Sequence, residues 1–281
     1  MGGAIARLTP RDGWLTHAGV RLHYLDWGDP AHPAAVFLHG GSAHAHWWDF
    51  TLPGLVDRYR CVALDLRGHG ESSRPDDGNY ALAAHADDVG ATIDALDLQR
   101  PALIGHSFGG FVAMVVAGRN APRLAALAIV DSRARIGVRS ARMLEALRKL
   151  PHPRWPDAAE AIARFRLLPA ATAATPEVMA YVAERAVQQA GDNTWTLKFD
   201  RRALAGAPAQ DLAPHLAAAR CPVLAVRGAH SDVVDAAALD EFRAAVPDVE
   251  IAEIAGAYHH VMLDQPAALA QVLGGFLDRH R

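Results

Sequence analysis

The chain has 281 residues, of which 51% are hydrophobic, and carries a formal net charge of −3 at pH 7. This length and apolar content are typical of one large α/β domain with room for an inserted subdomain. The slightly negative charge argues against a sequence-independent nucleic-acid surface, so we expect no nucleic-acid partner.

The cysteines and the apolar runs indicate a cytoplasmic protein. Cys61 and Cys221 each begin an apolar strand-like run, which is typical of core residues in a reducing compartment rather than of a disulfide or metal site. Residues 1–14 lack the apolar core of a secretory signal. The longest apolar run, residues 108–118, is too short to cross a bilayer. We expect a soluble monomer or homodimer with no membrane partner.

Strand and helix patterns alternate along most of the chain. Two strand-like runs, at 14–16 and 20–27, flank a turn at 17–19. Further strands are expected at 34–38, 61–66, 102–105, 124–130, 223–226 and 249–254. Helices are expected at 47–58, 82–96, 110–117, 236–246 and 266–278. Such alternation predicts an α/β fold with a mostly parallel central sheet and helices on both faces.

Residues 136–219 interrupt this alternation. The stretch is rich in Ala, Arg and Pro and shows helical periodicity without a convincing strand. A structureless loop of that length is implausible inside a compact domain. We therefore expect an inserted helical cap at 136–219, which divides the α/β core into residues 1–135 and 220–281.

Residues 105–109 read Gly-His-Ser-Phe-Gly and lie between an apolar strand and a small-residue helix. This context is typical of a nucleophile elbow, in which Ser107 occupies a tight strand-to-helix turn. Gly105 and Gly109 leave room for strained backbone and for close packing of strand and helix. The helix N-terminus lies beneath the serine, where negative charge would develop. The pattern predicts that Ser107 is a nucleophile.

A serine hydroxyl needs a base to take its proton, and the sequence offers His259. This histidine follows the strand expected at 249–254. It therefore lies at the carboxyl edge of the sheet, where parallel α/β folds build their sites. The order of serine, long insertion and histidine fits the nucleophile-elbow architecture.

Four segments together resemble the α/β-hydrolase superfamily, and the resemblance extends over nearly the whole chain. They are His39-Gly40-Gly41, Asp65 to Ser72, the elbow at 105–109 and His259 to Pro266. The resemblance implies the α/β-hydrolase fold, a small-molecule substrate and no cofactor. In the family the base precedes a proline by seven residues, which selects His259 over His260 here. Tyr258 replaces the glycine that usually precedes the base.

The sequence leaves the acid of a catalytic triad open. In most of the family the acid follows the penultimate strand, about three residues after a glycine. That slot is Ser231 here, and Asp232 comes one residue late. A subset of the family places the acid after the strand that follows the elbow, and Asp131 ends that strand. We favour Asp131, with Asp232 as the alternative, as the carboxylate that orients His259.

The resemblance also implies an oxyanion hole of two backbone N–H groups. The N–H of Phe108 follows the nucleophile, and the second donor is expected from Gly41, with Ser42 as the alternative. We interpret His39 as a residue that fixes this loop. Residues 65–72 resemble a structural signature of the family, and we assign them no chemistry.

Trp47 and His106 are expected to line the substrate pocket. His44 and His46 alternate with other residues next to Trp47, but this spacing does not supply a tetrahedral ligand set. An aromatic pocket wall or the start of a helix is the better interpretation, so we predict no metal site.

The start of the expected cap is unusually basic. Between Arg133 and Arg166, nine Arg or Lys residues stand against three acidic residues. Bidentate arginines suit carboxylate or phosphate groups. We expect Arg133 and Arg135 to bind a carboxylate-bearing substrate, and a solvated helical face is the alternative interpretation.

The expected function is a serine hydrolase that cleaves an ester or amide of a small molecule through an acyl-enzyme, as in carboxylesterases. Epoxide hydrolases and haloalkane dehalogenases resemble this fold but use aspartate at the position of Ser107. Two alternatives remain open. One is a carbon–carbon hydrolase of ring-cleavage products, in which an aromatic residue commonly occupies the position of His260. The other is a non-catalytic ligand receptor of the same fold.

Overall fold

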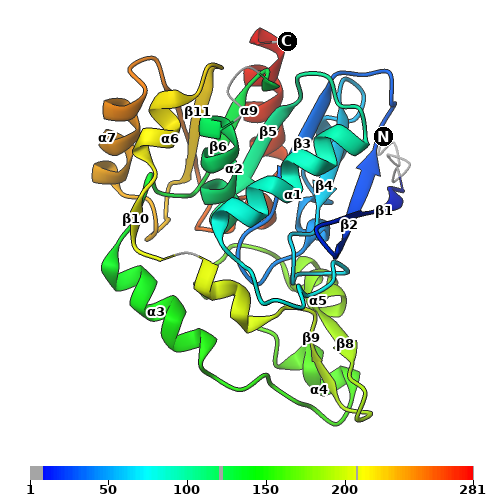
Figure 1. Cartoon of the computed structure of the whole chain (residues 1–281). Helices are drawn as coiled ribbons and strands as arrows, with labels where there is room; N and C mark the ends of the chain where they lie inside the picture. Colours follow the sequence, from blue (N-terminus) through cyan, green and yellow to red (C-terminus); the bar gives the residue numbers. More distant parts are fainter. Residues whose placement is uncertain (1–8, 120–122, 207, 281) are drawn as a thin grey trace, which may run out of the picture.

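The computed structural model describes residues 9–119, 123–206 and 208–280, and its centre is one eight-stranded sheet (Figure 1). Its strands are β1 (Arg11–His17), β2 (Val20–Trp27), β3 (Ala34–Leu38), β4 (Arg60–Leu64), β5 (Ala102–His106), β6 (Leu127–Val130), β11 (Val223–Gly228) and β12 (Glu250–Ile254). They lie in the order β1-β2-β4-β3-β5-β6-β11-β12. β2 is antiparallel to β1 and to β4, and the other neighbours are parallel. The predicted mostly parallel sheet is confirmed.

Successive residues of the central strands point to opposite faces of the sheet, so each strand contributes side chains to a hydrophobic cluster on each face. In β3, Phe37 packs on one face and Val36 and Leu38 on the other. The first face is covered by α9 (Pro266–Arg279). The second is covered by α1 (Leu82–Ala95), α2 (Phe108–Arg119), α6 (Ala213–Ala218) and α7 (Ala236–Ala245). No helix in the described ranges combines the length and apolar content needed to cross a membrane.

The N-terminal part of the core contains one confirmed turn and one incorrect helix. Ala18 and Gly19 join β1 to β2 with φ values of 46° and 75°. This left-handed backbone suits a two-residue hairpin, and it confirms the expected turn. The helix predicted at 47–58 is wrong, because the chain instead forms two short 3-10 helices, η1 (Ala45–Trp48) and η2 (Leu52–Gly54). Pro53 has no N–H to donate, so a continuous helix through it is disfavoured.

Most of the segment between β6 and β11 lies below the sheet in the view of Figure 1. It contains β7 (Arg135–Ile136), α3 (Val138–Arg148), α4 (Ala158–Ala163), α5 (Pro176–Ala186), β8 (Val187–Gln189), β9 (Trp195–Leu197), η4 (Arg201–Gly206) and β10 (Gln210–Asp211). The expectation that this stretch has no strand is wrong. β8 and β9 form a hairpin whose turn includes Asn193 at φ 62°, and Asp192 accepts a hydrogen bond from the Thr194 N–H. Such turn chemistry is a hairpin signal that helical periodicity obscures. α6 packs against α2 and α7, so the chain returns to the core before residue 219.

Candidate active site

The predicted nucleophile lies on a strained turn between β5 and α2. Ser107 has a φ of 51°, and its N–H donates to the carbonyl of Val130 at 3.0 Å. A Cβ at Gly105 would lie 2.3 Å from the carbonyl oxygen of Gly109. A Cβ at Gly109 would lie 2.5 Å from the carbonyl oxygen of His39. Glycine is therefore required at both positions for the strand and helix to meet at this angle.

Three residues far apart in the sequence meet at the carboxyl edge of the sheet. His259, in the loop between β12 and α8 (Val261–Asp264), has its Nε2 3.1 Å from the Ser107 Oγ. Its Nδ1 lies 2.8 Å from Oδ1 of Asp131, which directly follows β6. His259 and Asp131 are buried, with 4% and 0% of their surface exposed. The geometry thus links serine, imidazole and carboxylate in one chain of hydrogen bonds.

The carboxylate of Asp131 is held by two further donors. Ser231 Oγ donates to Oδ1 at 2.6 Å, and the backbone N–H of Gly228 donates to Oδ2 at 2.8 Å. Asp232 is exposed, and the carboxylate next to His259 is that of Asp131. Ser231 occupies the slot in which most of the family carries its acid, and sequence reasoning gave it no role. The signal that could have revealed its role is its place in that slot after β11. The carboxylate that it contacts comes from the end of the neighbouring strand β6.

Burial sets the charge states of this pair. Burial raises the pKa of Asp131 to about 6, and the two donors to its carboxylate oppose that rise. Burial and the neighbouring His260 hold the pKa of His259 well below its ordinary value. His259 is therefore neutral at pH 7, with a proton on the nitrogen that faces Asp131. Its Nε2 lone pair is then free to accept the Ser107 proton.

The loop after β3 approaches the start of α2. A Cβ at Gly40 would lie 3.2 Å from the Cβ of Ser107, and a Cβ at Gly41 would lie 3.8 Å from the Cβ of Phe108. Ser42 adopts a left-handed backbone with φ 65°. Within the described ranges, the N–H groups of Gly41 and Phe108 make no hydrogen bond to another backbone group. The two predicted donors therefore lie in neighbouring backbone segments beside the serine, and both can donate to a ligand oxygen.

Buried polar contacts fix that loop. The Nδ1 of His39 donates to the carbonyl of Gly40 at 2.7 Å, and its Nε2 accepts from the N–H of Leu66 at 3.0 Å. The carboxylate of Asp65 accepts from the N–H of Ala45 at 2.6 Å. His39 is therefore engaged through both nitrogens, as a loop-fixing residue would be.

The two predicted pocket residues lie around the base. The Nε2 of His106 donates to the backbone carbonyl of His259 at 2.9 Å, and the two rings are 4.7 Å apart. Trp47 packs edge-on against His260 at 5.3 Å and is 4% exposed. His106 thus contacts His259 directly, whereas Trp47 packs against the neighbouring His260.

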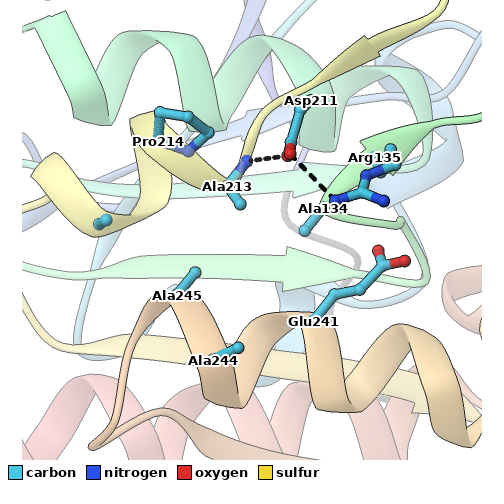
Figure 2. Close-up of a pocket in the computed structure, with 9 residues that line it drawn as sticks. Ala134, Arg135, Asp211, Ala213, Pro214, Glu241, Ala244 and Ala245 are labelled. Atoms are coloured by element: carbon cyan, nitrogen blue, oxygen red, sulfur yellow. Dashed lines mark hydrogen bonds and ion pairs between the residues drawn. The ribbon is translucent and has the colours of Figure 1, made fainter.

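The two arginines predicted to bind substrate are both paired with carboxylates in the structure. The Arg133 guanidinium lies 3.4 Å from the carboxylate of Asp235, the N-cap of α7, and 3.6 Å from that of Glu241 within α7. Arg135 pairs with Asp211 of β10 at 3.0 Å, and Figure 2 shows its side chain directed at that carboxylate. Each guanidinium group is matched by carboxylates outside the triad, because β7 pairs with β10 and Arg133 faces α7.

Comparison with known proteins identifies the family. A family model described as the α/β hydrolase fold matches residues 33–266. The chain belongs to this family. It is 30% identical over 264 residues to the esterase Rv0045c of Mycobacterium tuberculosis. The match covers 90% of this chain and 85% of that protein.

Two other relatives complete the comparison. The chain is 28% identical over 257 residues to the 2-(acetamidomethylene)succinate hydrolase of Mesorhizobium japonicum, which covers 88% of each. A crystal structure of E-2-(acetamidomethylene)succinate hydrolase superposes with a TM-score of 0.83 over 96% of this chain and 99% of that one, at 24% identity. Human epoxide hydrolase 4 is 37% identical over 104 residues, and the match covers 37% of this chain and only 29% of that protein. These relatives are all hydrolases.

Proposed function

We propose that this protein is a serine hydrolase that cleaves an ester or amide bond of a small molecule through an acyl-enzyme. The observation that carries the proposal is the hydrogen-bond chain from Ser107 Oγ through His259 to Asp131, at 3.1 and 2.8 Å. Such a chain is recognised by its geometry rather than by sequence position.

In the proposed reaction, His259 Nε2 takes the proton of Ser107 as Oγ attacks the acyl carbonyl. The carboxylate of Asp131 stabilises the imidazolium that forms. The N–H groups of Phe108 and Gly41 bind the oxyanion, with help from the N-terminus of α2. His259 then protonates the leaving group, and water attacks the acyl-enzyme with His259 again as the base.

The relatives support ester or amide hydrolysis over the other chemistries of the fold. One relative that covers most of this chain is named an esterase, and another is named for hydrolysis of an acetamido compound. The matches to epoxide hydrolases cover less than a third of those proteins. Ser107 also stands where epoxide hydrolases carry an aspartate, which disfavours an alkyl-enzyme mechanism here.

The experiment combines covalent labelling with turnover. A fluorophosphonate probe should label the wild-type protein, and short-chain p-nitrophenyl esters should be hydrolysed. Ser107→Ala should remove labelling and leave less than about one hundredth of the activity, because only the oxyanion hole and binding remain. Ser132→Ala is the matched control, since it makes the same change at a buried serine outside the chain of hydrogen bonds.

The other outcomes identify the alternatives. Labelling without turnover of any ester or amide would favour a receptor that retains the triad. Turnover restricted to a ring-cleavage diketone would favour a carbon–carbon hydrolase. Activity that survives in Ser107→Ala would refute the nucleophile.

A further inference from the structure

Three imidazole rings lie together at the site: His106, His259 and His260. One ring nitrogen of each lies within 4.8 Å of those of the other two. All three side chains are buried, with at most 4% of each residue exposed. The ester hydrolysis proposed above uses only one of these rings as a base, so the other two have no chemical role in it.

The hydrogen bonds of the two outer rings determine their tautomers. His106 uses Nε2 toward the carbonyl of His259, and His260 uses Nε2 toward the carbonyl of Pro169 at 2.8 Å. A carbonyl oxygen only accepts, so both Nε2 atoms carry the proton. The Nδ1 atoms of His106 and His260 then carry lone pairs, and both are buried without a hydrogen-bond partner among the residues that the structure describes. Buried acceptors without partners are uncommon, and each calls for a ligand or water.

The third ring adds another lone pair. His259 donates from Nδ1 to Asp131, which leaves Nε2 unprotonated toward Ser107. A carboxylate that accepts from the far nitrogen of an imidazole is also the common support of a metal-ligating histidine.

We propose that His106, His259 and His260 form an inhibitory site for a divalent transition metal that prefers nitrogen ligands, and Zn²⁺ is the ion used to test it. Neutral imidazole is a preferred ligand of Zn²⁺, Ni²⁺ and Cu²⁺, whereas Mg²⁺ and Ca²⁺ prefer oxygen. Zn–N bonds of about 2.0–2.1 Å place ligand nitrogens about 3.4 Å apart in a tetrahedral site, so modest ring movement closes the cluster. The bound ion takes the Nε2 lone pair that Ser107 needs, and hydrolysis stops. The inhibition, though not the binding, rests on the proposed function.

The test measures inhibition and binding separately. Zn²⁺ should inhibit ester hydrolysis by the wild-type protein, EDTA should restore it, and Mg²⁺ and Ca²⁺ should have no effect. In His260→Asn the Zn²⁺ concentration for half inhibition, relative to the variant's own activity, should rise at least about tenfold. His46→Asn is the matched control, because its ring is paired with Asp49 outside the cluster, and its sensitivity should not change.

Calorimetry with Zn²⁺ and the Ser107→Ala variant keeps binding separate from activity. One Zn²⁺ should bind per chain, and His260→Asn should weaken that binding at least about tenfold. Binding without any hydrolytic activity would support the metal site and count against the proposed function. Equal Zn²⁺ sensitivity of wild type and His260→Asn, or no binding to Ser107→Ala, would overturn the metal site while leaving the hydrolase intact.

Discussion

Ser231→Ala should shift the pH dependence of hydrolysis without removing the activity. The Ser231 hydroxyl donates at 2.6 Å to the Asp131 oxygen that also accepts from His259. Both Ser231 and Asp131 are buried, at 8% and 0% exposure, so the bond is shielded from solvent. It favours the ionised carboxylate and thereby opposes burial, which raises the pKa of Asp131 to about 6. Its removal should therefore raise that pKa further.

The magnitude follows from the bond and the charge. A hydrogen bond to a charged group contributes about 1.5–3 kcal/mol, and one pKa unit corresponds to about 1.4 kcal/mol. The pKa of Asp131 should rise from about 6 to about 7–8. Hydrolysis needs ionised Asp131 and neutral His259, so activity is lost as pH falls through this value. At pH 7 kcat/KM should fall about twofold to tenfold, and near pH 9 it should approach the wild-type plateau.

The assay is kcat/KM for one p-nitrophenyl ester from pH 5 to pH 9, corrected for spontaneous hydrolysis. Ser132→Ala is the control, because the Ser132 Oγ is buried beside Asp131 in sequence but has no hydrogen-bond partner in the described chain. Its acid limb should match that of the wild type. An unchanged acid limb in Ser231→Ala, or an equal loss at every pH, would refute the role assigned to this bond.

Three further substitutions test the assignments. In ester assays, Asp131→Asn should lower kcat about 10,000-fold by disturbing the histidine tautomer. Asp232 is exposed, and Asp232→Asn should change kcat less than about twofold. A larger loss in Asp232→Asn than in Asp131→Asn would identify Asp232 as the acid. Arg133→Ala and Arg135→Ala should leave the kcat/KM ratio of a monomethyl dicarboxylate to its dimethyl ester within about twofold, since both arginines are paired away from the triad; a larger change would return them to the pocket. Asp65→Asn should cost about 3–5 kcal/mol in urea unfolding at pH 7, because it removes a buried, hydrogen-bonded carboxylate. Although burial disfavours its charge, hydrogen bonding to histidine holds the pKa of Asp65 below its ordinary range, so the wild-type stability should fall below about pH 4 and the variant's should fall less steeply.

The sequence predicted the features that depend on near neighbours in the chain. The strand runs, the hairpin turn at 17–19 and the elbow around Ser107 each follow from periodicity or turn chemistry within a few residues. His259 followed from its place after the last strand and its distance to Pro266. These patterns were enough to predict the mostly parallel sheet and the places of Ser107 and His259 in it.

The tertiary structure decided which distant groups meet. Asp131 and Asp232 are both carboxylates after strands, and the order β6-β11-β12 in the sheet brings Ser231 and His259 onto the same Asp131 oxygen. The basic run containing Arg135 predicted a substrate carboxylate beside it, and the pairing of β7 with β10 places the carboxylate of Asp211 there. A one-residue shift in a loop redirects a side chain completely, and charges pair with whatever the fold brings within a few ångströms. Such contacts join residues about a hundred positions apart, so local pattern carries no information about them.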